Sequence, residues 1–72
     1  MKIKTIVAIT RACNRAKTKH PMFAENIYQA ISLASEELGE MAQAVNDGDM
    51  KKARKEALDL IAVCVRFLEW EK

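Results

Sequence analysis

Four acidic residues form two pairs whose spacing suits metal chemistry. Glu37 and Glu40 are three residues apart, and so are Glu56 and Asp59. Residues three apart on an α-helix lie on one face, with only about 60° between them around the axis. Two such pairs on adjacent antiparallel helices would bring four carboxylates together, and these repel one another unless a cation neutralises them. Ligands that are all oxygen favour a hard cation, so we predict Mg²⁺, with Mn²⁺ as a substitute.

The surroundings of these acids strengthen the metal interpretation. Glu37 lies in an apolar stripe, because its neighbours three and four residues away include Leu33, Ala34 and Met41. Glu36 lies toward the polar side of the same segment. In the run 57–65, Asp59 is the one residue that is not apolar. A carboxylate in such surroundings is costly unless it is paired or bound to a metal.

Ion pairs on the helix surface are the simpler alternative. Lys52 precedes Glu56 by four residues, and Lys55 precedes Asp59 by four. Opposite charges at this spacing attract each other on a helix. For Glu56 the alternative stays open. For Glu37 and Asp59 we expect it to fail, because both lie among apolar residues and the stripe of the second segment carries no base.

Two breaks in the pattern define the elements that position these acids. Pro21 disfavours helix at the residue before it, and residues 46–48, Asn-Asp-Gly, favour a turn with a left-handed glycine. Asp49 suits the N-cap of the segment that follows. The chain is rich in Ala, Leu, Glu, Lys and Met, which favour helix. We therefore predict one all-α domain over residues 1–72, with helices at roughly 2–18, 24–46 and 50–70.

The apolar residues predict more burial than three short helices can provide. The second helix has apolar residues at spacings of three and four, namely Ile27, Ala30, Ile31, Ala34, Leu38, Met41 and Val45. The third helix is apolar nearly all round from 57 to 65, which is typical of an element buried on more than one side. A chain of 72 residues is short for an independent core. We expect a three-helix subunit whose antiparallel helices complete a four-helix-type bundle in a homodimer or homotetramer, with the third helix at the subunit boundary.

Charge is unevenly distributed along the chain. Residues 1–20 contain six lysines or arginines and no acid, whereas residues 21–72 contain six bases and ten acids. A basic segment of this kind could contact phosphates. It lacks interleaved aromatic residues and a helix-turn-helix signature, so we expect no nucleic-acid partner.

The cysteines and the longest apolar runs bear on location. Cys13 and Cys64 lack metal-ligand spacing and are typical of small buried apolar residues. Without a disulfide framework a reducing, cytoplasmic location is expected. We predict neither an export signal nor a membrane span, since Arg11 interrupts the short apolar run at the start.

The acidic segments also resemble a known family. Residues 36–40, Glu-Glu-Leu-Gly-Glu, are followed after fifteen residues by 56–59, Glu-Ala-Leu-Asp. This resembles the EExxE…ExxD signature of the all-α nucleoside triphosphate pyrophosphohydrolases, which include MazG, the dimeric dUTPases, the dCTP pyrophosphatases and phosphoribosyl-ATP pyrophosphohydrolase. The chain looks most like the short MazG-like proteins of phages and bacteria. The similarity runs from about His20 to Leu68. Members of the family commonly have longer subunits with four or more helices.

The resemblance implies an activity and roles for the acids. Members hydrolyse the α–β phosphoanhydride of a nucleoside triphosphate, giving a monophosphate and pyrophosphate, with Mg²⁺ held by an acidic quartet. By position, Glu37, Glu40, Glu56 and Asp59 match the ligands. Glu36 matches an accessory acid that orients the attacking water, so the expected catalytic residues are Glu36, Glu37 and Glu40.

Substrate contacts are open to two interpretations each. Lys52, Lys55 and Arg66 lie near the acidic face of the third helix and could hold outer phosphates, or could be solvated or ion-paired. His20 could reach a nucleotide or be structural. Phe23, Tyr28 and Trp70 could stack on a base, or pack in a helical core or interface. The competing function is a non-catalytic oligomeric helical interaction protein with a vestigial or structural metal site.

Overall fold

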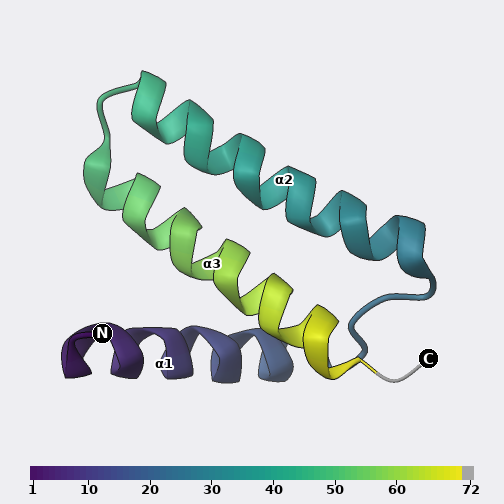
Figure 1. Ribbon diagram of the computed structural model, residues 1–72. Coiled ribbons are helices and arrows are strands. Elements are labelled where there is room, and N and C mark those ends of the chain that lie inside the picture. Colours follow the sequence, from purple (N-terminus) through teal and green to yellow (C-terminus); the bar gives the residue numbers. More distant parts are fainter. Residues whose placement is uncertain (71–72) are drawn as a thin grey trace.

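The protein is built from helices alone in the part that the structure describes. The computed structural model describes residues 1–70 and contains α1 (Ile3–Lys19), α2 (Ile27–Asn46) and α3 (Met50–Glu69), with no strand among those residues (Figure 1). The all-α prediction is confirmed. The predicted bounds of the first and third helices are within one residue of the observed ones. Over residues 1–70, no helix combines the length and the apolar character needed to cross a membrane.

Helix α2 begins three residues later than the predicted start at 24, because Asn26 caps it. The backbone of Asn26 is extended, and its side-chain oxygen accepts a hydrogen bond from the backbone N–H of Gln29 (2.9 Å). The side-chain oxygen of Gln29 accepts a hydrogen bond from the backbone N–H of Glu25, the residue before the cap (2.6 Å). The first bond satisfies a donor that the helix leaves free, and the pair resembles a capping box in which the second donor lies one residue earlier. Residues 20–26 therefore form a loop.

The turn between α2 and α3 has the predicted chemistry. Gly48 takes a left-handed conformation with φ 73°, which glycine adopts without the steric penalty of a side chain. Its N–H donates to the carbonyl of Val45 (3.0 Å), and the N–H of Asp49 donates to that of Ala44 (2.9 Å). These two bonds end α2 in a Schellman motif. The side chain of Asp49 then accepts from the N–H of Lys52 (3.0 Å), so the predicted N-cap of α3 is confirmed.

Helix α3 is the central element of the chain. It packs antiparallel to α2 on one side and along α1 on the other, while α1 and α2 make no close backbone contact with each other (Figure 1). The fully buried apolar residues are all alanines, namely Ala12, Ala30, Ala44, Ala53 and Ala62. Small side chains let the helices approach closely, but they leave the larger apolar residues only partly covered.

Apolar surface stays uncovered on two helices. Although helices of its own chain pack against α3 on two sides, Ile61, Phe67 and Leu68 of α3 are 37–83% exposed, so the place of α3 at a subunit boundary stays a prediction. A second uncovered apolar surface lies on α2, where Ile27, Ile31, Leu38 and Val45 are 48–62% exposed. The α2 residues turned to α3 are Ala30, Leu33, Glu37 and Ala44, which are buried or half-buried.

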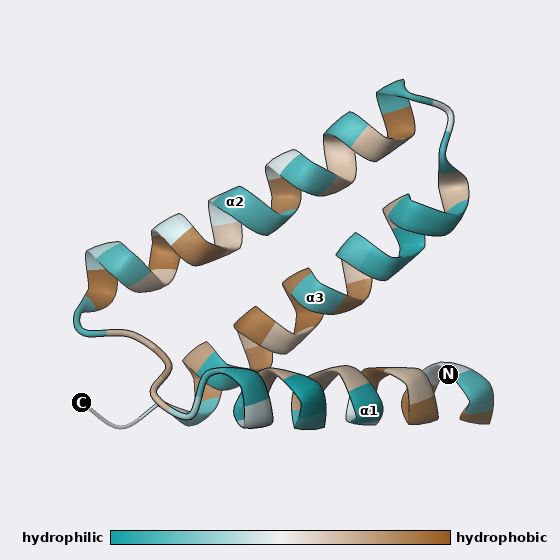
Figure 2. Cartoon of the chain, turned by 180° about the vertical axis from the view of Figure 1, so that it is seen from behind, coloured by the Kyte–Doolittle hydropathy of each residue, from teal (hydrophilic) through white to brown (hydrophobic). Residues whose placement is uncertain are grey.

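Helix α1 is divided along its length. Its N-terminal half is largely hydrophobic and its C-terminal half hydrophilic (Figure 2). Ile3, Ile6 and Val7 are exposed, while Ala12 is buried. The hydrophilic half lies beside the loop 20–26 and the C-terminal part of α3 (Figure 1). There it helps to form the cleft described below.

Candidate metal centre

The contact between α2 and α3 brings three of the four predicted metal ligands together. Glu37, Glu56 and Asp59 each offer a carboxylate oxygen, and these oxygens all lie within 4.8 Å of one another. Glu56 is only 4% exposed, and the other two residues are half-buried. The spacing of three residues on α3 and the inward position of Glu37 on α2 produce this convergence.

The other two acids of the motif lie at its edge. Glu40 is exposed and outside the group of three. Hydrogen bonding with the Glu56 side chain and the negative charge of Glu56 raise the pKa of Glu40. Glu36 is exposed and lines the cleft beside the cluster. The structure thus separates an inner group of three carboxylates from two outer ones.

Two oxygens of the cluster are buried without a partner. Glu37 Oε2 and Glu56 Oε2 have no hydrogen-bond donor within reach in the described part of the chain. An unsatisfied buried carboxylate oxygen is unfavourable. The atoms that could bind a metal are all carboxylate oxygens, and two of them lack hydrogen-bond partners. The residues therefore fit a hard divalent cation.

The pKa values of the cluster reflect the close approach of its carboxylates. Burial raises the pKa of Glu37 to about 7, helped by a hydrogen bond with Glu56 and by the charges of Glu40 and Asp59. Burial alone would raise the pKa of Glu56. Hydrogen bonding with Glu40 and Glu37 and the positive charge of Lys55 outweigh the effect of burial, so the pKa of Glu56 is lowered. Glu37 therefore retains its proton up to near neutral pH, and binding of a cation would release that proton.

A lysine lies against the same carboxylates. Lys55 Nζ is 3.0 Å from Asp59 Oδ2 and 3.6 Å from Glu56 Oε1. A hydrogen bond with Asp59 and the charges of Asp59 and Glu56 raise the pKa of Lys55. The expectation that ion pairing would fail at Asp59 is therefore wrong. The side chain of Asp59 is 30% exposed at the rim, where the long stem of Lys55 reaches it from one turn earlier. Lys52 makes no corresponding pair with Glu56 within residues 1–70.

An open cleft of about 790 Å³ extends from the cluster toward α1. Apolar side chains line its interior, with Glu36, Glu37, Lys55 and Asp59 on the α2–α3 side. Arg15, Lys19 and His20 line it on the α1 side. His20 was a predicted substrate contact, whereas Arg15 and Lys19 were not assigned individually. The signal for them was the excess of bases in residues 1–20, but only the fold shows which of those bases reach the cleft. Lys52 lies outside it.

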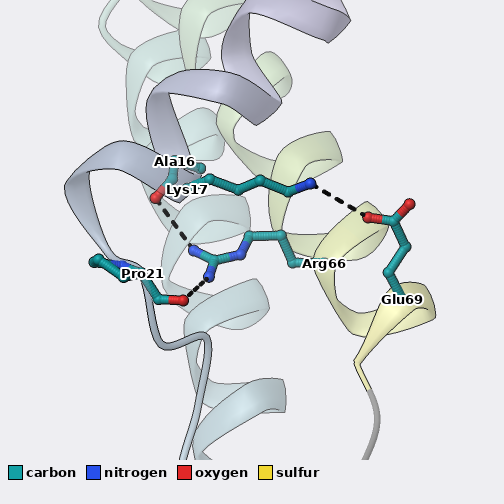
Figure 3. Close-up of polar contacts among 5 residues, drawn as sticks. All are labelled: Ala16, Lys17, Pro21, Arg66 and Glu69. Atoms are coloured by element: carbon teal, nitrogen blue, oxygen red, sulfur yellow. Dashed lines mark hydrogen bonds and ion pairs between the residues drawn. The ribbon is translucent and has the colours of Figure 1, made fainter.

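Arg66 has a structural position within this cleft. Its two terminal nitrogens donate to the carbonyls of Ala16 and Pro21, each at 3.2 Å (Figure 3). Its guanidinium carbon lies 5.4 Å from the centre of the Phe23 ring. Arg66 thus joins α3 to the C-terminal end of α1 and to the loop, and two of its five N–H donors bind backbone carbonyls. Nearby, Lys17 Nζ is 3.9 Å from Glu69 Oε1.

The aromatic candidates for base stacking differ in their relation to the cleft. Phe23 lines the cleft, and Trp70 packs edge-on against it with ring centres 5.5 Å apart. Tyr28 is 79% exposed and outside the cleft. Of the three, Phe23 alone lines the cleft, and its ring is engaged by the Arg66 guanidinium and by Trp70.

Comparison with models of protein families, with curated proteins and with solved structures found no match to this chain. The cleft has a buried acidic cluster on one side and cationic side chains on the other. Opposite charges on its two walls suit a ligand that combines negative charge with a cation.

Proposed function

We propose that the protein is a Mg²⁺-dependent nucleotide pyrophosphohydrolase that cleaves the α–β phosphoanhydride of a (deoxy)nucleoside triphosphate. The observation that carries the proposal is the convergence of Glu37, Glu56 and Asp59, with two buried oxygens that lack partners, at a cleft lined by bases. The products are a nucleoside monophosphate and pyrophosphate. The resemblance of residues 36–40 and 56–59 to the pyrophosphohydrolase signature supports the same reaction.

In this proposal Glu37, Glu56 and Asp59 hold the metal, with Glu40 beside Glu56 as a fourth ligand. Bound Mg²⁺ neutralises phosphate charge and makes a bound water more acidic. Mn²⁺ prefers similar oxygen ligands and is expected to substitute. Glu36 lines the cleft with its side chain exposed, so it can accept a hydrogen bond from the attacking water and orient it.

The basic wall of the cleft supplies the complementary charge. Arg15 and Lys19 form no ion pair in the described chain, so both are available to phosphate oxygens. His20 adjoins them. Phosphoryl transfer depends mainly on positioning and on charge neutralisation. A cleft of about 790 Å³ lies in the range of small-molecule sites, roughly 300–1,000 Å³.

We further propose that the active form is a homo-oligomer, a homodimer or homotetramer, in which α2 meets a second copy. Six apolar residues of α2 alternate at spacings of four and three, namely Ile27, Ile31, Ala34, Leu38, Met41 and Val45. That repeat is typical of a helix seam that packs against another helix. Pairing of two α2–α3 hairpins along it would complete a four-helix-type bundle.

The direct test is pyrophosphate release from a panel of canonical and modified nucleoside triphosphates, with Mg²⁺, with Mn²⁺ and with chelator. We expect metal-dependent release from at least one nucleotide. In Glu37→Gln we expect a loss of about 100-fold or more, because an interaction made in the transition state is removed. Glu69→Gln is the matched control, since Glu69 is an exposed acid of α3 outside the cleft. Release that persists in chelator, or in Glu37→Gln, would contradict the proposal.

The uncovered seam of α2 favours one alternative, a non-catalytic helical interaction protein with a structural or vestigial metal site. Its apolar residues are 48–62% exposed at four positions, which suits binding to another helix. The two functions separate in the same assay. Folded, oligomeric protein that binds Mn²⁺ but releases pyrophosphate from no nucleotide would favour the alternative.

A further inference from the structure

The position of Lys55 relative to the acidic cluster has a consequence for metal binding. Its ammonium lies 3.0 Å from Asp59 Oδ2 and 3.6 Å from Glu56 Oε1. Asp59 and Glu56 are two of the three residues whose oxygens converge. The ammonium therefore lies beside the carboxylates that a divalent cation would use.

We propose that Lys55 is the resident counter-ion of the metal-free cluster, and that a divalent cation binds by displacing its ammonium. This inference rests on the proposed metal site. Two cations close to the same carboxylate oxygens repel each other strongly where water is partly excluded. The ammonium and the metal should therefore exclude each other from Asp59 and Glu56.

Lys55 is suited to such an exchange by its chemistry and its exposure. Lysine carries a compact charge on a flexible stem. The side chain of Lys55 is 65% exposed, whereas that of Glu56 is only 6% exposed. The lysine can therefore swing into solvent while the carboxylate stays in place. Arg66 offers the contrast, since backbone carbonyls hold both of its terminal nitrogens.

A single ammonium also compensates the cluster incompletely. Glu37 Oε2 and Glu56 Oε2 remain buried without partners although Lys55 is in place. A cation with two charges and several coordination positions would satisfy more of these oxygens than lysine does. The exchange would thus favour the cluster. Because Lys55 lines the cleft, its displaced ammonium would lie in the solvent of that cleft and would be available to a phosphate group, so metal binding and anion binding would support each other.

The test is Mn²⁺ binding to the metal-free protein, followed by electron paramagnetic resonance and calorimetry, for the native chain and Lys55→Gln. Loss of the competing ammonium should tighten Mn²⁺ binding by about fivefold, the scale of a partly exposed ion pair. Lys51→Gln is the matched control, because it removes the same charge from an exposed lysine of α3 that forms no ion pair in the described chain. At about 0.15 M salt we expect the control to change the affinity less than about twofold. Equal affinities for Lys55→Gln and Lys51→Gln would overturn the proposal.

A second readout separates exchange from a merely structural ion pair. Without metal, Lys55→Gln should unfold at a lower temperature than the native chain, because the carboxylates lose their counter-ion. With saturating Mn²⁺ the difference should vanish or reverse. A deficit of the same size with and without Mn²⁺ would mean that Lys55 is only structural.

The outcomes also distinguish this inference from the proposed function. If the native chain binds Mn²⁺ and Lys55→Gln binds it more tightly, the inference holds even if no nucleotide releases pyrophosphate. If neither variant binds Mn²⁺, both the inference and the metal-dependent function are wrong. If the enzyme is active, Lys55→Gln should bind metal more tightly but raise the KM for nucleotide. Tighter metal binding together with weaker nucleotide binding is expected only if the metal displaces the ammonium of Lys55.

Discussion

At the scale of single residues, the main feature is a group of carboxylates that two helices hold closer than their charges favour. Glu56 is buried at the α2–α3 contact, with Glu37 and Asp59 at its side. The protein compensates in two ways, by retaining a proton and by the ion pairs of Lys55. Both are sensitive to conditions, so the stability of the metal-free protein should depend on pH and on divalent cations.

The pH dependence has a definite sign. The pKa of Glu37 is about 7 in the folded protein against 4.5 without the fold. Between these values the folded protein binds more protons than the unfolded chain, so the free energy of unfolding should decrease as pH rises through this window. We expect the metal-free protein to melt at a lower temperature near pH 8 than near pH 5. Circular dichroism melting in the presence of chelator checks this.

Two comparisons make that prediction specific to the cluster. Glu37→Gln should flatten the pH dependence, because glutamine has no proton to lose, and saturating Mg²⁺ should flatten it in the native chain. An unchanged slope in Glu37→Gln would show that other groups cause the dependence.

At the scale of the elements, local caps decide where the helices begin and end. Asn26 and Gln29 set the start of α2, while Gly48 and Asp49 set the turn into α3. The turn matters for the acidic cluster because it joins α2 to α3 and so limits how Glu37 can be placed against Glu56. The loop before Asn26 also contributes to the cleft.

Removing the cap of α2 should cost stability. Asn26→Ala deletes the oxygen that accepts the N–H of Gln29, so we expect a loss of about 1 kcal/mol in the free energy of unfolding. Urea unfolding followed by circular dichroism measures it. Asn26→Asp keeps the acceptor and should lose much less. If both variants lost the same amount, the effect could not be ascribed to the cap.

At the scale of the whole molecule, α3 holds the three helices together, because it packs against both α1 and α2. Because the outer helices flank α3 without close backbone contact between them, a cleft remains, with acids on one side and bases on the other. Arg66 keeps this cleft in shape by joining α3 to the end of α1 (Figure 3). The same open arrangement leaves the seam of α2 uncovered.

The exposed seam predicts self-association. Leu38→Lys places a charge at the middle of the seam, at a residue that is 56% exposed in the single chain. We expect this variant to shift from oligomer to monomer in sedimentation velocity, because a lysine would be buried unpaired at the interface. Ser32→Lys is the matched control, since Ser32 is exposed on α2 outside the seam. A native chain that sediments as a monomer at all concentrations would contradict the proposed assembly.

Much of the architecture followed from the sequence because its causes are local. The turn at Gly48, the cap at Asp49 and the helix-forming composition depend on neighbours in the chain. They gave three helices with bounds close to those observed. Spacing by three residues likewise predicted that Glu56 and Asp59 share a face of α3. The late start of α2 at Ile27 could also have been found, since Asn26 and Gln29 have the spacing of a capping box.

What the sequence alone determined about this protein is thus its helices and the acidic pairs that they carry. Only the tertiary structure decided which faces meet. It left Ile31 and Leu38, two members of the predicted apolar stripe, in solvent, and it placed Arg66 on backbone carbonyls of a distant segment. The physical reason is that helix periodicity fixes directions around one axis, whereas contacts between helices depend on how closely their surfaces fit, and the fit is made by residues far apart in the chain.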